Sequence, residues 1–306
     1  MVQNDFKLDF VIIGGQKCGS TYLQTVIEKH PEVDMPSGEV PYLESPDYED
    51  NGIDKLRIVL NDLDQSKLIG IKRPNYLSKP EVKKRMIAIN PDVKAIVILR
   101  NPIERLKSAY FHYINDGFTP VLPLNKGVDL LLKGKLKAKY PRTDELIEFG
   151  LYAKYLKDYI TLFKDNLLVL FYDDLKTNQL ETIKKCYSFL NIDNSFVLED
   201  SHLNSRPQKV NYSLLRARLL TKKNAHKYVY NDKRTRLFLK KQSVYNKFVC
   251  KTIDRIDQRI ISRFFYDDKK PSFDQELKKS LIEIYKADIS NLEAMCNVDL
   301  SNWTKI

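Results

Sequence analysis

Four short apolar segments, each followed by a stretch with helical periodicity, constrain the fold of this 306-residue chain more than any other feature. Apolar runs of about four to eight residues that end in turn residues are typical of strands buried on both faces. Strands that alternate with helices form a parallel sheet whose two faces are covered by helices. The sequence therefore predicts a three-layer α/β fold, with strands at residues 9–15, 68–72, 94–99 and 167–171.

Amphipathic segments fill the intervals between these strands and follow the last one. Pro31 ends the first segment, and Asn101 with Pro102 provides an N-cap and a first helical residue for the third. Residues 120–142 are expected to form loops around a short helix, and residues 192–210 a loop. The predicted helices are residues 20–30, 80–89, 101–113, 144–163, 173–190, 212–226, 232–265 and 273–295.

No linker rich in Pro, Gly or Ser divides the chain, which contains only 10 Gly and 13 Pro. A chain of this length can form one large α/β domain. We therefore expect a single domain over residues 1–306. It would consist of a core at about 6–200, a basic helical C-terminal elaboration at about 206–270, and a terminal helix at about 272–296.

Positive charge is concentrated in one segment. The chain has 51 Lys and Arg against 40 Asp and Glu, a net charge of +11, yet residues 206–263 alone hold 17 basic and 3 acidic side chains. This segment suits an anionic partner, namely a polyanionic glycan, a phospholipid surface or nucleic acid, although a solvated helical face has the same pattern. In the predicted helix at 232–265, a basic ridge runs beside an apolar stripe. The ridge is Lys247, Lys251, Arg255, Arg259 and Arg263, and the stripe is Tyr245, Phe248, Val249, Ile253, Ile256, Ile260 and Phe264.

Neither a membrane-spanning segment nor a metal site is predicted. No run of about 18 uncharged apolar residues occurs, and the first residues lack the apolar centre of a signal peptide. We therefore expect a cytoplasmic protein, unless an N-terminal membrane anchor has been trimmed from the sequence. The four His and four Cys have no metal-ligand spacing, and the cysteines are expected to be mostly reduced thiols or to form one incidental pair. The cysteines are Cys18, Cys186, Cys250 and Cys296.

The segment GGQKCGST, residues 14–21, joins the first predicted strand to the first predicted helix. A strand, a glycine-containing turn and a helix N-terminus bring several backbone N–H groups around one point, which makes a cradle for an anion. The spacing Gly14-x4-Gly19 matches the P-loop that binds ATP or GTP, but Ser20 replaces the lysine of that motif. Lys17 is the only lysine within residues 14–21, so the loop suits a single 5′-phosphate better than a γ-phosphate with its metal ion. A tight turn without a ligand is the alternative interpretation.

Two motifs together resemble the sulfotransferase family, whose members move a sulfuryl group from 3′-phosphoadenosine 5′-phosphosulfate (PAPS) to an acceptor. GGQKCGST resembles the family's 5′-phosphosulfate loop, and RNPIERLKSAY, residues 100–110, resembles its 3′-phosphate motif. The resemblance implies a P-loop NTPase-like fold, PAPS as co-substrate, adenosine 3′,5′-bisphosphate as product and no required metal. The implied PAPS-binding residues are Gly15, Gln16, Lys17, Cys18, Gly19, Ser20 and Thr21 in the loop, with Arg100 and Ser108 in the second motif.

The residue types in the second motif agree with this chemistry. Arg100 ends a predicted strand and offers a planar fork of donors to a phosphate, and Ser108 follows about two helical turns later. Ligands of parallel sheets bind outside the carboxyl ends of the strands, where both motifs are expected to lie. The alternative interpretation of Arg100 is a surface salt bridge.

The resemblance also implies the catalytic residues. EVPYL, residues 39–43, is similar to the E-V-H-F-F-like stretch of the glycan-modifying branch, which makes Glu39 the general base, although Pro41 replaces the histidine. KRPNY, residues 72–76, is similar to a K-x-P-x-Y element, so that Lys72 and Lys17 would form a two-cation clamp on the transferring group. The acceptor is expected to contact Tyr42, Arg73 and Tyr76, and the rival bases are Glu44 and Asp47.

The function we expect is sulfuryl transfer from PAPS to a hydroxyl or amine of a carbohydrate, with a glycan or glycolipid as acceptor. One alternative is a P-loop kinase of a small molecule, which Ser20 in place of the motif's lysine disfavours. Another is a non-catalytic protein that binds nucleic acid or a membrane through residues 206–263. No nucleic-acid motif occurs in that segment, so no nucleic-acid partner is expected.

Overall fold

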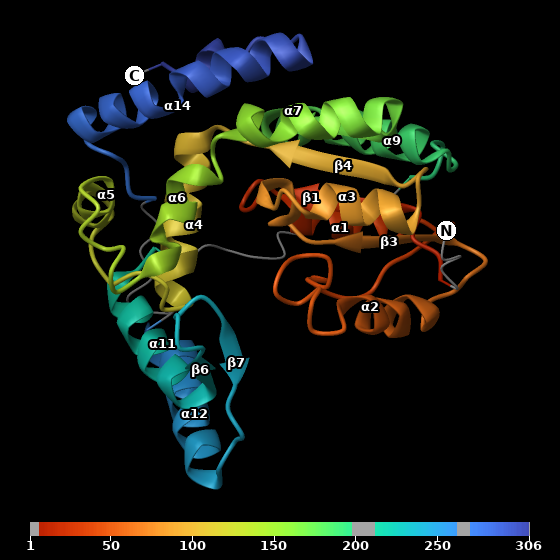
Figure 1. The fold of residues 1–306 in the computed structure, drawn as a ribbon. Coiled ribbons are helices and arrows are strands. Elements are labelled where there is room, and N and C mark those ends of the chain that lie inside the picture. The colour runs from red at the N-terminus through yellow and green to blue at the C-terminus, as the bar shows by residue number, and fades with distance from the viewer. Residues whose placement is uncertain (1–5, 198–211, 262–269, 306) are drawn as a thin grey trace. The chain divides into compact units, whose positions relative to one another are not determined.

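The computed structural model describes residues 6–197, 212–261 and 270–305 (Figure 1). The chain divides into two compact units. The sheet unit comprises Met1–Asn101, Leu151–Pro207 and Asp288–Leu300, and the helical unit comprises Pro102–Gly150, Gln208–Ala287 and Ser301–Ile306. Two such units can belong to one domain, so the single domain over residues 1–306 stays a prediction.

A sheet of five parallel strands forms the centre of the sheet unit, in the order β2-β3-β1-β4-β5. β1 lies between β3 and β4, and all of its residues are buried. Phe10 of β1 pairs with Gly70, where any side chain would overlap the Phe10 ring. The three-layer α/β prediction and its four strands are confirmed. The strands are β1 (Phe10–Gly14), β2 (Val33–Asp34), β3 (Leu68–Lys72), β4 (Lys94–Leu99) and β5 (Leu167–Phe171).

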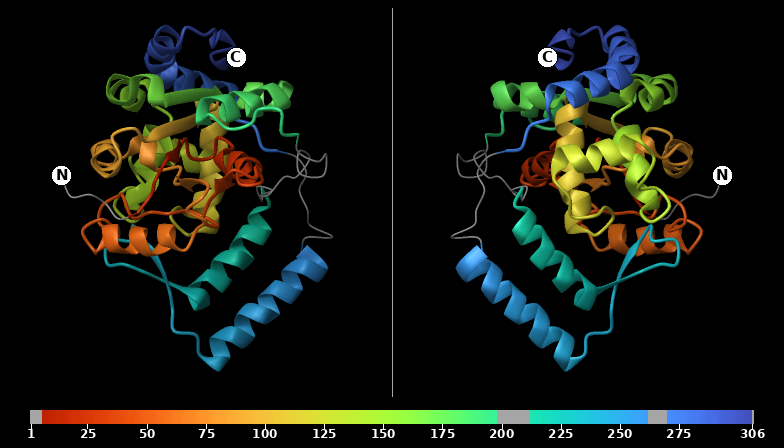
Figure 2. Two further views of the ribbon diagram at one scale, coloured as in Figure 1. Left: turned by 90° about the vertical axis from the view of Figure 1, so that its right-hand side faces the viewer. Right: turned by 90° about the vertical axis from the view of Figure 1, so that its left-hand side faces the viewer.

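The order in which successive strands are added to the sheet reverses direction at β1. The chain leaves β1 toward β2 and β3, and then returns past β1 to β4 and β5. Right-handed crossovers in opposite directions put their helices on opposite faces of the sheet, and Figure 2 shows α1 (Ser20–Ile27) on one side and α3 (Val82–Ile89) on the other. Such a reversal of strand order opens a crevice at the carboxyl ends of the strands, which is where doubly wound folds bind ligands.

The remaining helices of the sheet unit pack around this sheet. The start of α7 is held by Asp288 of α14 (Gln275–Cys296), whose carboxylate accepts hydrogen bonds from the backbone N–H groups of Ala153 at 2.9 Å and Lys154 at 3.0 Å. A carboxylate at a helix N-terminus satisfies N–H groups that have no partner within the helix. These helices are α2 (Gly52–Asn61), α7 (Tyr152–Phe163), α8 (Tyr172–Thr177) and α9 (Gln179–Leu190).

The helical unit begins with α4 (Pro102–Asn115), which starts at a proline as predicted. Its core is built on the buried face of α4, where Arg105 is fully buried and donates a hydrogen bond to the backbone carbonyl of Leu146. α11 and α12 lie side by side, joined by the β6–β7 hairpin (Figure 1). The other elements are α5 (Leu124–Leu132), α6 (Glu145–Glu148), α11 (Leu214–Lys227), β6 (Tyr228–Tyr230), β7 (Leu237–Leu239) and α12 (Val244–Ile256).

Two of the predicted helices are divided in the structure. The prediction of one helix at 144–163 is wrong, since α6 ends at Glu148 and α7 starts at Tyr152. At the break, the Ile147 carbonyl accepts hydrogen bonds from the Gly150 N–H and the Tyr285 hydroxyl, and a side chain at Gly150 would lie 2.8 Å from the Tyr285 ring. The predicted helix at 173–190 is likewise divided at Asn178, whose backbone leaves the helical region with a φ of −128° and a ψ of 54°.

The predicted helix at 232–265 is also wrong in its first part. Residues 231–243 instead contain the turn and second strand of the β6–β7 hairpin. The Asn231 side chain accepts hydrogen bonds from the backbone N–H groups of Thr235 at 2.7 Å and Arg236 at 2.9 Å, which favours a turn over a helix. The helix begins only after Ser243, whose hydroxyl caps it by accepting from the Asn246 N–H at 3.1 Å. Arg263 and Phe264 lie outside the described residues.

The longest helix that the structure describes is α14, with 22 residues, which agrees with the predicted terminal helix. Charged side chains recur along it, from Glu276 to Glu293. Within residues 6–197, 212–261 and 270–305, no helix combines the length and the apolar content that crossing a membrane requires.

Candidate active site

The loop between β1 and α1 is held at both ends by backbone hydrogen bonds. The Gly15 N–H donates to the Ile98 carbonyl of β4 at 2.6 Å, and the Leu23 N–H donates to the Gly19 carbonyl at 3.1 Å. The N-terminus of α1 has no side-chain cap, and its N-cap residue is Gly19. Uncapped N–H groups at a helix N-terminus favour an anion, so the predicted cradle has the backbone that it requires.

Two glycines are needed for this course of the loop. Gly19 has a φ of +103°, and a side chain there would lie 3.0 Å from the Tyr172 ring. A side chain on Gly14 would come within 2.6 Å of the Pro74 carbonyl oxygen. Between them, Lys17 adopts the left-handed conformation with a φ of +63°. Non-glycine residues in that region cost free energy and cluster at functional sites, which agrees with a role for Lys17 in binding.

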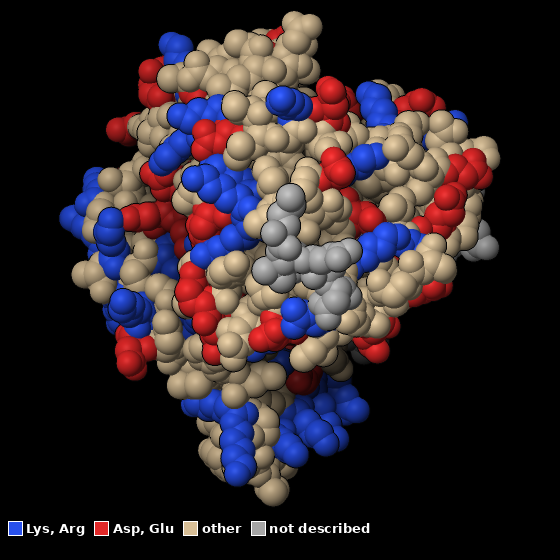
Figure 3. Space-filling model, turned by 45° about the vertical axis from the view of Figure 1, so that its right-hand side comes forward, with Lys and Arg blue, Asp and Glu red and all other residues tan. Residues whose placement is uncertain are grey.

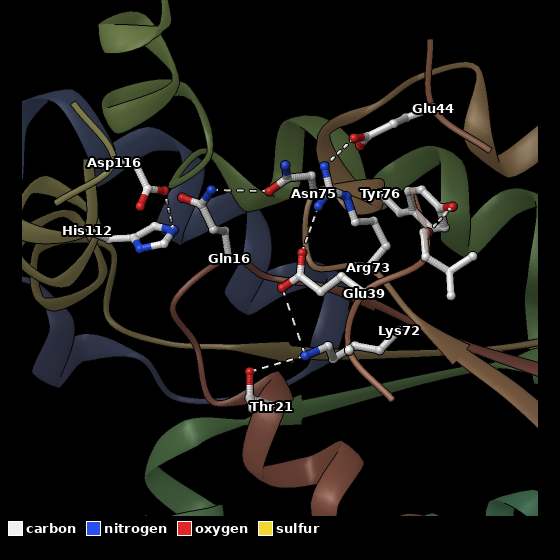
Figure 4. Close-up of polar contacts among 12 residues, drawn as sticks. Gln16, Thr21, Glu39, Glu44, Lys72, Arg73, Asn75, Tyr76, His112 and Asp116 are labelled. Carbon is white, nitrogen blue, oxygen red and sulfur yellow. Dashed lines mark hydrogen bonds and ion pairs between the residues drawn. The ribbon is translucent and has the colours of Figure 1, made fainter. Parts of the chain in front are cut away.

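Lys72 joins the loop to the predicted base (Figure 4). Its ammonium nitrogen Nζ donates to Thr21 Oγ1 at 3.2 Å and lies 3.9 Å from Glu39 Oε1. The Lys72 side chain is only 3% exposed, and that of Glu39 is 40% exposed. Burial lowers the pKa of Lys72, an effect that the Glu39 carboxylate opposes in part. Three residues predicted from separate motifs therefore lie within reach of one another.

Arg73 holds two carboxylates at once. Its guanidinium donates to Glu39 Oε2 at 2.7 Å through Nη1 and to the buried Glu44 carboxylate through Nη2. A buried carboxylate requires a hydrogen-bonded cation, and a guanidinium fork provides directional donors. Arg73 thus fixes the orientation of Glu39, and its predicted contact with the acceptor stays a prediction.

The segment that carries Glu39 is fixed by Tyr76 as well. Tyr76 is fully buried, its hydroxyl donates to the Val40 carbonyl at 2.5 Å, and it accepts from the Leu43 N–H at 3.0 Å. Burial raises the pKa of Tyr76, so that the hydroxyl keeps its proton. This geometry gives Tyr76 a positioning role, and its predicted contact with the acceptor stays a prediction. Tyr42, which was predicted to line the acceptor site, is partly exposed.

A buried pair of polar side chains at the loop leaves one hydrogen-bond acceptor unused among the described residues. Gln16 Nε2 donates to Asn75 Oδ1 at 3.2 Å, and both residues are about nine-tenths buried. Gln16 Oε1 is buried without a hydrogen-bond partner among the described residues. Buried polar atoms in folded proteins are nearly always hydrogen-bonded, so this atom points to a ligand donor that completes the site.

Arg100 leaves the end of β4 and lies against the loop. Its Nη1 lies 3.5 Å from the Lys17 carbonyl oxygen, and its guanidinium carbon lies 4.6 Å from the centre of the Tyr172 ring. The Tyr152 hydroxyl donates to the Arg100 carbonyl at 2.8 Å and lies 3.5 Å from Cys18 Sγ. The predicted cation for the second phosphate therefore contacts the predicted cradle for the first. Ser108 is buried on α4 in the helical unit, and its cooperation with Arg100 stays a prediction.

Comparison with known proteins identifies the family. The family model described as the sulfotransferase domain matches residues 7–295. The chain belongs to the sulfotransferase family. The prediction made from the two motifs is thus confirmed at the level of the family.

Relatives of this sulfotransferase match parts of it. The membrane-associated sulfotransferase kil1 of Dictyostelium discoideum is 35% identical over 106 residues, which is 33% of this chain and 22% of kil1. The human heparan sulfate glucosamine 3-O-sulfotransferase 3B1 is 28% identical over 157 residues, which is 50% of this chain and 38% of that protein. The matches therefore span well under half the length of either relative.

A solved structure is similar over nearly the whole sulfotransferase. The crystal structure of a sulfotransferase from Alicyclobacillus acidocaldarius superposes with a TM-score of 0.67 at 19% identity, covering 98% of this chain and 99% of that one. At this identity the similarity supports the fold alone.

Several residues of this candidate site were not predicted from the sequence. Asn75, Tyr152 and Tyr172 all contact the loop or Arg100. Asn75 lies within KRPNY, and Tyr172 directly follows the predicted strand at 167–171, so the sequence could have indicated both, whereas no motif indicates Tyr152. In the part of the chain that the structure describes, no group of three His, Cys, Asp or Glu side chains is arranged to hold a metal ion.

Proposed function

We propose that this sulfotransferase transfers the sulfuryl group of PAPS to a hydroxyl or amine of a carbohydrate. The observation that carries the proposal is the placement of Lys72 Nζ, 3.2 Å from Thr21 of the loop and 3.9 Å from Glu39. A cation and a carboxylate next to an anion cradle supply the charge stabilisation and the proton acceptor that group transfer requires.

The residues present fit PAPS as the donor. The uncapped N-terminus of α1 suits the 5′-phosphosulfate, and Arg100 beside the loop suits the 3′-phosphate. Gln16 Oε1, which has no hydrogen-bond partner among the described residues, could accept a hydrogen bond from a hydroxyl or amino group of the nucleoside. Ser20 stands where ATP-binding loops carry the lysine that reaches the β- and γ-phosphates, which disfavours the kinase alternative. PAPS supplies the activated sulfuryl group.

In the proposed mechanism, Glu39 accepts the proton of the acceptor hydroxyl or amine as its oxygen or nitrogen bonds to sulfur. The bond between sulfur and the bridging phosphate oxygen breaks, which leaves adenosine 3′,5′-bisphosphate. Lys72 and Lys17 stabilise the negative charge on the transferring group and on the leaving oxygen. Arg73 orients the Glu39 carboxylate through the 2.7 Å hydrogen bond.

The acceptor class rests on two supports. The similarity of EVPYL to the glycan-modifying branch is one, and the 28% identity to a heparan sulfate glucosamine 3-O-sulfotransferase is the other. A glycan or glycolipid is therefore the acceptor that we propose.

The donor can be tested by calorimetric titration, with a chelator present for the bisphosphate and with Mg²⁺ present for ATP. We expect adenosine 3′,5′-bisphosphate to bind without metal, and more tightly than ATP with Mg²⁺, because the loop lacks the P-loop lysine. Labelled PAPS should then transfer its sulfuryl group to at least one member of a glycan and glycolipid panel. Tight ATP binding with Mg²⁺ and no bisphosphate binding would instead favour the kinase.

The pH profile of kcat/KM should reveal the buried lysine. Because burial lowers the pKa of Lys72, the ammonium loses its proton at a lower pH than an ordinary lysine does. Activity should therefore fall on the alkaline side as the pH rises through this lowered pKa. Arginine keeps its charge to above about pH 12, so the alkaline limb of Lys72→Arg should move to higher pH. An alkaline limb at the same pH in both proteins would assign it to another group.

A further inference from the structure

Exposed apolar side chains and basic side chains share one surface of the helical unit. We name it the α12 surface. It is formed by α12 and the end of β7, whose most exposed apolar residues are Leu239 at 70%, Val244 at 86%, Tyr245 at 66% and Phe248 at 68%. Large apolar side chains so close together in the chain are unusual on a surface that faces only water. The basic members are Lys241, Lys247, Lys251 and Arg255, all of them exposed.

Two of the three acidic residues of this region are paired with basic side chains of α11. Asp257 accepts two hydrogen bonds from the Arg216 guanidinium, at 2.7 and 2.9 Å, and Asp254 accepts one from Lys223 at 2.5 Å. These pairs tie α12 to α11. Residues 212–261 hold 14 Lys and Arg against 3 Asp, and two of those Asp are thus neutralised within the helix pair. Figure 3 shows Lys and Arg side chains gathered over the part of the helical unit that Figure 1 labels α11, β6, β7 and α12.

The outward face of α12 combines both kinds of side chain. Val244, Phe248, Lys251 and Arg255 follow one another at intervals of four, three and four residues, which places them on one face of the helix. No residue of α12 is buried. The predicted apolar stripe therefore does not pack into the protein along its whole length, because Tyr245, Phe248 and Ile256 are all at least 38% exposed.

We propose that the α12 surface docks the protein on an anionic phospholipid bilayer. A lipid interface offers phosphates to Lys and Arg and an apolar boundary to Val244, Tyr245 and Phe248. A polyanionic glycan or a nucleic acid would satisfy the positive charge but would leave most of the exposed apolar area in water. Of these three partners, only the lipid surface accommodates both the basic and the apolar side chains.

The proposal is tested by sedimentation of the full chain with vesicles of phosphatidylcholine, with or without phosphatidylserine. We expect binding to the anionic vesicles and little to the neutral ones. The double variant Tyr245→Ser/Phe248→Ser should weaken binding by about tenfold or more, since two apolar side chains no longer enter the interface. Lys251→Glu/Arg255→Glu should weaken it by at least about fivefold for each charge removed.

Matched controls separate docking from folding and from nonspecific effects. Ile58→Ser/Leu180→Ser removes two apolar side chains that are 71% and 48% exposed in the sheet unit, and Lys184→Glu/Lys185→Glu reverses two exposed charges on α9. Both controls should bind vesicles as the unchanged protein does, and all variants should melt at similar temperatures. Equal loss in controls and α12 variants would overturn the proposal.

Other partners give distinguishable results. Binding to heparin or to an oligonucleotide, but not to the anionic vesicles, would replace the lipid with a polyanion. Self-association that Tyr245→Ser/Phe248→Ser abolishes, without vesicle binding, would assign the surface to a second copy of the chain. Either result overturns the proposal and leaves the proposed sulfuryl transfer untouched, because none of these residues belongs to the candidate active site.

Discussion

Replacing Glu39 by glutamine should lower kcat by about 10²- to 10⁴-fold, the range that a general base contributes. The amide keeps the size of the carboxylate and can still accept from Arg73, but it cannot take the proton of the acceptor. Because Glu39 follows β2 and is not part of the loop, the affinity for adenosine 3′,5′-bisphosphate should stay nearly unchanged. Initial rates with labelled PAPS and calorimetric titration of the bisphosphate measure the two quantities separately.

Glu44→Gln is the matched control for this substitution. Glu44 also accepts a hydrogen bond from Arg73, but its side chain is only 6% exposed, whereas that of Glu39 is 40% exposed. We expect Glu44→Gln to lower thermal stability, because the Arg73 guanidinium loses its buried negative charge partner, while kcat changes much less than in Glu39→Gln. A large loss of kcat in Glu44→Gln, with full activity in Glu39→Gln, would move the base to Glu44.

The central strands were predictable because their apolar composition reflects burial on both faces of the sheet. β1, β3, β4 and β5 are continuous apolar runs, as expected of strands with helices on both faces. β2 has only two residues and leaves no periodicity to recognise. The breaks at Gly150 and Asn178 and the hairpin at Asn231 depend on local hydrogen bonds, which periodicity in a window of residues cannot reveal.

The residues of the candidate site that lie within contiguous sequence motifs could be predicted. Backbone N–H groups of a strand–turn–helix segment follow from glycine spacing alone, so the loop could be found. The contacts that complete the site join residues far apart in the chain. Lys72 and Thr21 are 51 residues apart, and Arg73 and Glu39 are 34 apart. The parallel pairing of β3 with β1 and β2 brings these residues together. The sequence does not reveal the side-chain directions that these contacts require.

The stripe of α12 illustrates a different limit. Helical periodicity predicts an apolar face, but it does not say whether that face packs within the protein or against a partner. The structure leaves Phe248 and Tyr245 exposed, which turns a feature expected of a core into a candidate docking surface. The cytoplasmic location expected from the sequence stays a prediction, and vesicle binding would be compatible with it.

Removing the cations of the two motifs should weaken binding of the nucleotide. Lys17→Ala and Arg100→Ala should each lower the affinity for adenosine 3′,5′-bisphosphate by about 10- to 100-fold, since a hydrogen bond to a charged group contributes about 1.5–3 kcal/mol. The losses need not add in the double variant, because Arg100 Nη1 lies 3.5 Å from the Lys17 carbonyl and the two sites share the loop. Calorimetric titration of each variant measures the effect.

Arg85→Ala controls for the loss of an arginine that stacks on a tyrosine. The Arg85 guanidinium lies 3.8 Å from the centre of the Tyr48 ring and pairs with Glu49, much as Arg100 lies over Tyr172, but it is outside both motifs. Its substitution should leave bisphosphate affinity unchanged. If Lys17→Ala and Arg100→Ala also bind the bisphosphate as tightly as the unchanged protein, the loop and the β4 terminus do not form the donor site. A loss confined to these two variants would support a bisphosphate site at the carboxyl ends of β1 and β4.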